Sequence, residues 1–205
     1  MSTEPSRSHA RSPMWKVERT LADRLGDPLL EHDDALVAVA AAFGAPGCAQ
    51  GLWEWLDDSA RALFATRTDD LRQRAAALAD LMTNRLGLAA CADRYEGLLL
   101  DHAVVRQSGH PLLLAAVGHE LSRRAGWPSF PAHADGGACT VLTAEGYFLP
   151  IFYGAVPDTL DAAQLRPRCA HATTYAVLTA IGRHAPADMA ASATRIRESL
   201  PIVAR

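Results

Sequence analysis

Apolar residues recur with the period of an α-helix through the first two-thirds of the chain. Asp33 and Asp34 are expected to cap a helix that ends near Gly44. The apolar positions between them follow the i, i+3, i+4, i+7 spacing of one buried helical face: Leu36, Val39, Ala40 and Phe43. The same kind of spacing predicts three further helices, over residues 52–64, 69–86 and 93–105.

Residues 111–125 predict the most buried helix of the chain. Pro111 suits the first helical position, and Gly126 suits the position just past the end. The residues at 112–117 are all apolar, which is typical of a helix buried on several sides. Helical patterning returns over residues 171–183 and again near the C-terminus.

The period changes after this buried helix. Residues 138–142 and 147–152 read as two strands, and residues 143–146 between them form a short hairpin turn. Helices, a small antiparallel sheet and further helices together predict the α+β class.

The length of 205 residues favours one domain over residues 14–205. We expect a helical part over 14–92, a core over 93–185 and a C-terminal helix or tail over 186–205. Residues 1–13 are polar and mixed, without the apolar stretch of a secretory signal, and predict a disordered arm.

Composition and charge exclude several classes of function. The chain has 20 basic and 23 acidic residues, so it lacks the excess of positive charge that is typical of nucleic-acid-binding proteins. No apolar run approaches the roughly 20 residues of a membrane span, and we expect a cytoplasmic protein. The cysteines are widely spaced and form no C-x-x-C pair, which indicates free thiols: Cys48, Cys91, Cys139 and Cys169.

The sequence lacks the common phosphate-loop, dinucleotide and serine-nucleophile motifs. His119 and Glu120 begin an H-E-x-x-H zinc pattern, but Arg123 stands at its closing position and cannot bind zinc. A metal would need three converging ligands, which the spacing of the other histidines does not indicate. We therefore predict no metal and no cofactor.

The middle of the chain resembles the SirB-type branch of the transglutaminase-like superfamily, over about residues 33–178. The order and spacing of three segments carry the resemblance: Leu86-Gly87-Leu88, then Val105-Arg106-Gln107-Ser108-Gly109-His110-Pro111, then Leu121-Ser122-Arg123-Arg124-Ala125-Gly126-Trp127-Pro128. The family resemblance implies a papain-like core with Cys at the start of the buried helix, His on the next strand and Asp on the one after.

The residues at these three positions do not support that chemistry. The helix start carries leucines at 112–114, with neither Cys nor Ser. The family's His falls on Gly137 without a gap, or on His133 with a short one, and Pro150 stands in place of the Asp. The resemblance therefore implies the fold and argues against the reaction.

The first functional hypothesis is a non-catalytic domain, with a binding or regulatory role toward a peptide, protein or small-molecule partner. Four polar residues are expected near the former active-site cleft and are the candidate ligand-binding residues: Asp101, Arg106, His110 and His133.

Two alternatives remain open at the level of sequence. A cysteine-type hydrolase or amide-bond transferase with rearranged residues would use Cys139 and His133. An assembly role, in a homo-oligomer or with another protein, would use Trp53 and Trp55, which cannot both face the core side of one helix.

Overall fold

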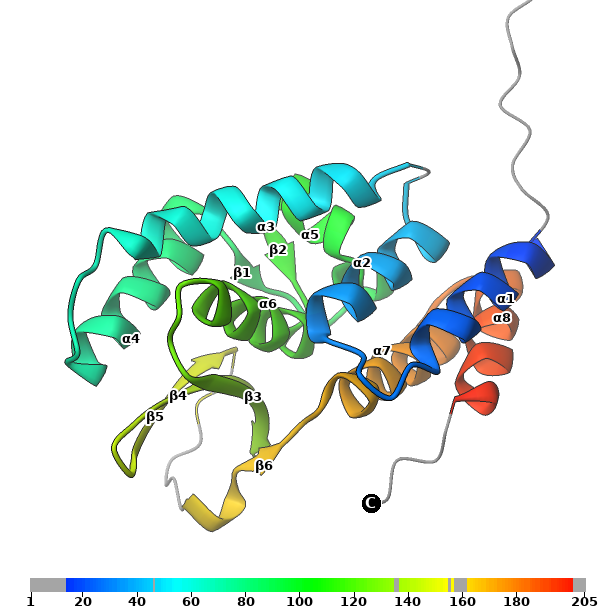
Figure 1. Ribbon diagram of the computed structural model, residues 1–205. Coiled ribbons are helices and arrows are strands. Elements are labelled where there is room, and N and C mark those ends of the chain that lie inside the picture. Colours follow the sequence, from blue (N-terminus) through cyan, green and yellow to red (C-terminus); the bar gives the residue numbers. More distant parts are fainter. Residues whose placement is uncertain (1–13, 46, 135–136, 155, 157–161, 201–205) are drawn as a thin grey trace, which may run out of the picture.

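The computed structural model describes residues 14–45, 47–134, 137–154, 156 and 162–200. These residues form eight α-helices, a four-stranded antiparallel sheet and a short parallel strand pair. Helix α6 (Pro111–Arg124) lies between the sheet and helix α3 (Ala49–Phe64), as Figure 1 shows. The predicted α+β class is confirmed, with a buried helix packed on a small antiparallel sheet.

Helix α6 begins and ends where the sequence predicted. Its N-cap is His110, whose Nδ1 accepts the backbone N–H of Leu112 at 3.2 Å, and Pro111 takes the first position. Gly126 follows the last turn with a φ of 76°. Leucines on several sides of the helix are fully buried, because the sheet covers one side and α2 and α3 cover others.

The sheet has the strand order β5-β4-β3-β6, and every neighbouring pair is antiparallel. Its strands are β3 (Ser129–Ala134), β4 (Gly137–Ala144), β5 (Tyr147–Tyr153) and β6 (Arg166–Pro167). The predicted hairpin is β4–β5, with a tighter turn than expected. Only Glu145 and Gly146 form it, both with positive φ, which matches the twist of the strands on either side.

Strand β3 was not predicted, and His133 lies within it rather than before the sheet. Its sequence, Ser-Phe-Pro-Ala-His-Ala, alternates too weakly in hydrophobicity to indicate a strand. Strand β6 is only two residues long and carries no pattern at all.

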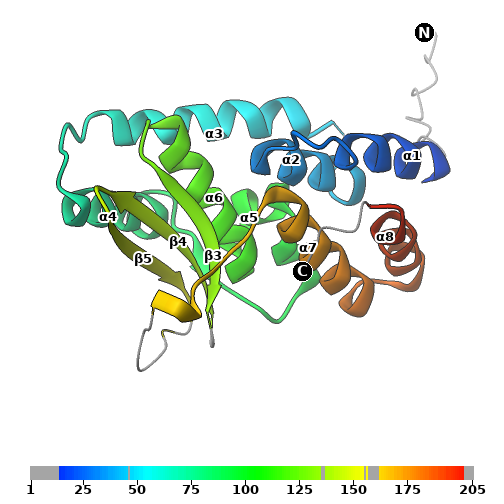
Figure 2. The ribbon, with the colours of Figure 1, turned by 60° about the horizontal axis from the view of Figure 1, so that its bottom comes forward.

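The remaining helices form two groups. One group consists of α4 (Leu71–Asp80), which packs on β4 and β5, the π-turn η1 (Leu81–Arg85), which contacts α3, and α5 (Leu100–Arg106), which contacts α2. The strands β1 (Ala89–Ala90) and β2 (Ser108–Gly109) pair with each other and so hold together the two ends of the segment 91–107. The other group lies at the end of the molecule opposite the sheet (Figure 2), and consists of α1 (Met14–Leu25), α2 (His32–Phe43), α7 (Ala170–His184) and α8 (Ala187–Ser199).

Three details of the predicted helices were wrong. Asp33 and Asp34 do not cap α2, because the helix begins at His32 and its N-cap is Glu31. Helix α3 begins at Ala49, before residue 52. Residues 93–105 are not one helix, because the chain is extended at Leu99 between the 3-10 turn η2 (Tyr95–Leu98) and α5.

None of the helices over the described residues has the combination of length and apolar character that crossing a bilayer requires. The predicted N-terminal arm, residues 1–13, lies outside the described part of the chain.

Candidate functional site

The start of α6 offers no nucleophile. Leu113 and Leu114 are buried there, and the His110 ring is occupied in capping the helix. The backbone N–H of His110 donates to the carbonyl of Gly97 at 2.7 Å, which ties this end of the helix to η2. Burial, and secondarily the charge of His184, lowers the pKa of His110.

The sheet face beneath α6 is closed by direct contact with the helix. The Thr140 hydroxyl donates to the carbonyl of Ala115 at 2.8 Å and lies 3.1 Å from the Tyr153 hydroxyl. Both hydroxyls are buried against Gly118, where a Cβ would overlap them. Gly137 begins β4 and Pro150 lies in the middle of β5, so neither position brings an acid–base group to this face.

The strand register does not bring the alternative pair Cys139 and His133 together. Cys139 is paired across the sheet with Ala132, whereas His133 is paired with Ala138. Successive residues of a strand point to opposite faces, so the two side chains lie on opposite sides of the sheet. Cys139 is fully buried among apolar side chains, and this burial raises the pKa of its thiol to about 11.

The other predicted ligand residues are distributed over different parts of the fold. The Asp101 carboxylate is buried and accepts the backbone N–H of Ala45 at 2.7 Å, so it holds the loop between α2 and α3. Arg106 is exposed at the end of α5, beside a cavity of about 30 Å³ that His102 also lines. His110 caps α6 and His133 lies in β3, so the four residues come from α5, the start of α6 and the sheet.

Trp53 and Trp55 are both half-buried against the main core. The guanidinium of Arg124 lies over the Trp53 ring at 5.7 Å from its centre. Both tryptophans thus pack partly against the core, although the sequence predicted that they could not both face it.

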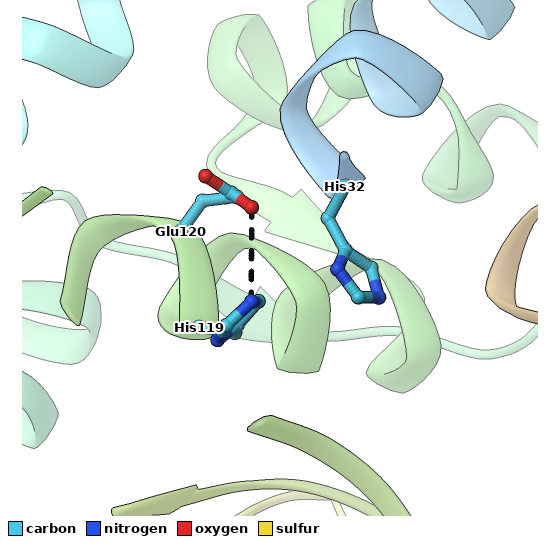
Figure 3. A group of neighbouring side chains, drawn as sticks. All are labelled: His32, His119 and Glu120. Atoms are coloured by element: carbon cyan, nitrogen blue, oxygen red, sulfur yellow. Dashed lines mark ion pairs between the residues drawn. The ribbon is translucent and has the colours of Figure 1, made fainter. Parts of the chain in front are cut away.

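A second group of polar side chains lies farther along α6, where α2 crosses the helix. His119 and Glu120 of α6 meet His32 from the first turn of α2 (Figure 3). One potential ligand atom from each of the three residues lies within 4.8 Å of the other two. The two imidazole rings stand nearly perpendicular, with their centres 4.9 Å apart.

Glu120 is fully buried, and only one of its two carboxylate oxygens has a hydrogen-bond partner among the described residues. Its Oε2 accepts a hydrogen bond from Nε of Arg123 at 2.9 Å and forms an ion pair with Nη2 of the same residue at 2.8 Å. Its Oε1 has no hydrogen-bond partner among the described residues and lies 3.8 Å from Nε2 of His119. A buried carboxylate oxygen without a donor is unfavourable, so this atom needs an explanation.

Acidic and basic side chains surround this group. Arg123 also contacts Glu31 at 3.0 Å and Asp33 at 2.9 Å. Arg124 contacts the same Asp33 oxygen at 2.8 Å and also pairs with Asp57. The two aspartates that the sequence suggested as helix caps thus differ in role, because Asp33 is a bridge between α2 and the end of α6.

Burial determines the charge state of the three central residues. It lowers the pKa of His32 and of His119 to about 4. A hydrogen bond with the backbone of Arg168 and the charge of Asp33 oppose this shift at His32, and the charge of Asp33 opposes it at His119. Burial raises the pKa of Glu120 to about 7, although the hydrogen bond from Arg123 lowers it. Near pH 7 both imidazoles are neutral, which is the form that binds metal ions.

Sequence reasoning identified part of this group. It named two of the three residues, His119 and Glu120, but only as an incomplete zinc pattern that Arg123 cannot close, and Arg123 is bound to carboxylates. His32 carried no signal, because its part in the group depends on how α2 packs across α6.

A hollow of about 510 Å³ lies at the turn end of the sheet. It is lined mainly by apolar and aromatic residues: Pro128, Phe130, Thr143, Ala144, Glu145, Gly146, Tyr147, Phe148, Leu165 and Pro167. Tyr147 and Phe148 are 75% and 43% exposed.

A scan against protein-family models and searches of curated proteins and solved structures found no match to this chain.

Proposed function

We propose that this chain is a non-catalytic transglutaminase-like protein that binds a protein or peptide partner. The observation that carries the proposal is the start of α6, where Leu113 and Leu114 are packed in the core and no nucleophile is present. By the resemblance, the family's His corresponds to Gly137 or, with a short gap, to His133, and its Asp corresponds to Pro150. A helix packed on a small sheet, with leucines at the start of the helix, supports a domain that has lost this chemistry.

The hollow at the turn end of the sheet is the surface best suited to such a partner. Its exposed aromatic side chains, Tyr147 and Phe148, are the kind of residue that anchors a protein interface. Glu145 is the single charged residue among the described ones that line it. The occupant that fits is an apolar peptide segment with a basic residue beside it.

A peptide-display selection tests this surface. We expect peptides enriched on the wild-type protein to lose about tenfold or more in affinity for a Tyr147→Ser/Phe148→Ser variant, since two aromatic anchors are removed. Tyr175→Ser, which changes an exposed aromatic residue on α7, is the matched control and should bind like the wild type.

Failure to enrich any peptide, or equal binding to the double variant, would contradict the assigned surface. Light scattering, which measures the oligomeric state, distinguishes binding of a partner from assembly of the chain with itself. A dimer of the wild type that the double variant abolishes would assign the hollow to a second copy of the chain instead.

Thiol chemistry tests the absence of catalysis. Because burial raises the pKa of Cys139 to about 11, its reactive thiolate is scarce throughout the range from about pH 5 to 9. We expect iodoacetamide to leave Cys139 unmodified in the folded protein across this range, as read by peptide mapping. Cys169 is exposed and serves as the internal control that alkylation proceeds.

Rapid alkylation of Cys139 near pH 7, without unfolding, would overturn the non-catalytic proposal. It would show that the sheet presents an activated thiol.

A further inference from the structure

We propose that His32, His119 and Glu120 form a zinc site that fastens α2 to α6. The site lies apart from the hollow of the sheet and does not depend on the function proposed for it. Two imidazole nitrogens and one carboxylate oxygen converge here within 4.8 Å. This mixture of nitrogen and oxygen donors suits Zn²⁺, which commonly takes three protein ligands of these types and one further ligand.

The unsatisfied oxygen of Glu120 is the second observation that points to a cation. Oε1 is buried without a donor among the described residues and faces Nε2 of His119. At 3.8 Å, Nε2 of His119 is too far away to form a hydrogen bond with this oxygen. A metal ion between Oε1 and Nε2 would satisfy both atoms at once.

Each of the two histidines has a hydroxyl group beside one ring nitrogen, which leaves its other ring nitrogen available to bind a metal. Nδ1 of His119 lies 2.9 Å from the Ser129 hydroxyl, which leaves Nε2 directed at the group. Nε2 of His32 lies 3.4 Å from the Thr173 hydroxyl, and Figure 3 shows the other ring nitrogen facing His119 and Glu120. Histidine ligands usually use their second nitrogen in this way, to fix the ring toward the metal.

The charge around the group favours a cation. Four carboxylates contribute to the network, those of Glu31, Asp33, Asp57 and Glu120, against the guanidinium groups of Arg123 and Arg124. A divalent ion beside Glu120 would compensate the excess of acidic groups. The positive charge of Arg123 is already shared among three of these carboxylates.

The spacing requires a small contraction. Zinc bonds of about 2.0–2.1 Å in a tetrahedron place neighbouring ligand atoms about 3.4 Å apart. The 3.8 Å between Oε1 and Nε2 is already close to this value, and the other separations, all within 4.8 Å, would have to close by rotation of the side chains. Because Glu120 and His32 are buried, the role that fits is structural rather than hydrolytic.

Metal titration of the purified full chain tests the site. After dialysis against a chelator, we expect calorimetry to show one Zn²⁺ bound per chain and Zn²⁺ to raise the melting temperature. We expect Co²⁺, used as a spectroscopic probe, to give the visible absorption of a tetrahedral site without bands from thiolate ligands.

Three variants make the test specific. Glu120→Gln keeps the shape of the side chain and removes the anionic ligand, and should weaken Zn²⁺ binding about 100-fold. Ser129→Ala leaves every ligand in place and removes only the support of His119, and should weaken binding by about 10- to 100-fold. His184→Gln changes an exposed histidine outside the group and should bind like the wild type.

Circular dichroism of each metal-free variant establishes that it is folded before titration. Three results would overturn the proposal: no binding of Zn²⁺ or Co²⁺ by the wild type, equal binding by Glu120→Gln, or a cobalt spectrum dominated by thiolate. In the first case, Glu120 is a buried protonated acid rather than a ligand.

Discussion

At Gly118 the central helix approaches the sheet so closely that only a hydrogen atom fits. An added Cβ would overlap the hydroxyls of Tyr153 and Thr140, which are both buried and bonded to each other. Thr140 also holds the carbonyl of Ala115, one turn earlier on the same helix. This single residue therefore sets the distance between α6 and the sheet.

We expect Gly118→Ala to destabilise the protein by about 1–3 kcal/mol, because the helix must move away from two buried hydroxyls. Gly51→Ala in α3 is the matched control, since a Cβ there meets nothing within 4 Å. The control should be stabilised by about 0.5–1 kcal/mol through the better helix propensity of alanine. Urea denaturation measures both, and equal effects would refute the tight contact.

At the scale of elements, the sequence predicted those whose signals are local. Helix α4 begins after Asp70, whose carboxylate accepts the N–H of Arg72 at 2.8 Å, and the predicted α6, α7 and β4–β5 hairpin all exist. Strands β3 and β6 were not predicted, because their pairing with neighbouring strands, rather than the pattern of their own residues, makes them strands. His32, the third candidate zinc ligand, was not predicted for the same reason, because only the packing of α2 on α6 brings it to Glu120.

The β4–β5 turn offers a prediction at this scale. Glu145 has a φ of 46°, a conformation that strains a long side chain and that asparagine adopts more readily. We expect Glu145→Asn to stabilise the protein by about 0.5–1 kcal/mol. Ala144→Asn, one residue earlier in β4, should bring no gain, and thermal denaturation of the two variants compares them.

On the scale of the whole molecule, the two larger of the three apolar clusters among the described residues share one helix. The main core surrounds α6, α3 and α4, and the second lies among α1, α7 and α8. Helix α2 contributes Leu36, Val37 and Ala40 to the first core and Ala35, Val39 and Phe43 to the second. Its run of small apolar residues, buried on nearly every side, is explained by this double contact.

We expect this sharing to make unfolding a single event. Val37→Ala and Val39→Ala each remove methyl groups from a different core and should each cost about 1–3 kcal/mol. Calorimetry should show one transition that both variants lower. Two transitions, each moved by only one variant, would show that the cores unfold independently.

The shared helix also governs the slow exchange of backbone hydrogens with solvent. Amides deep in α6 and in α7 belong to different cores, yet neither core can open widely without releasing α2. The free energy of opening measured by hydrogen exchange should therefore be the same for both sets of amides and equal the free energy of global unfolding. A protease that cuts only opened chains would find no partly unfolded half of this molecule to attack.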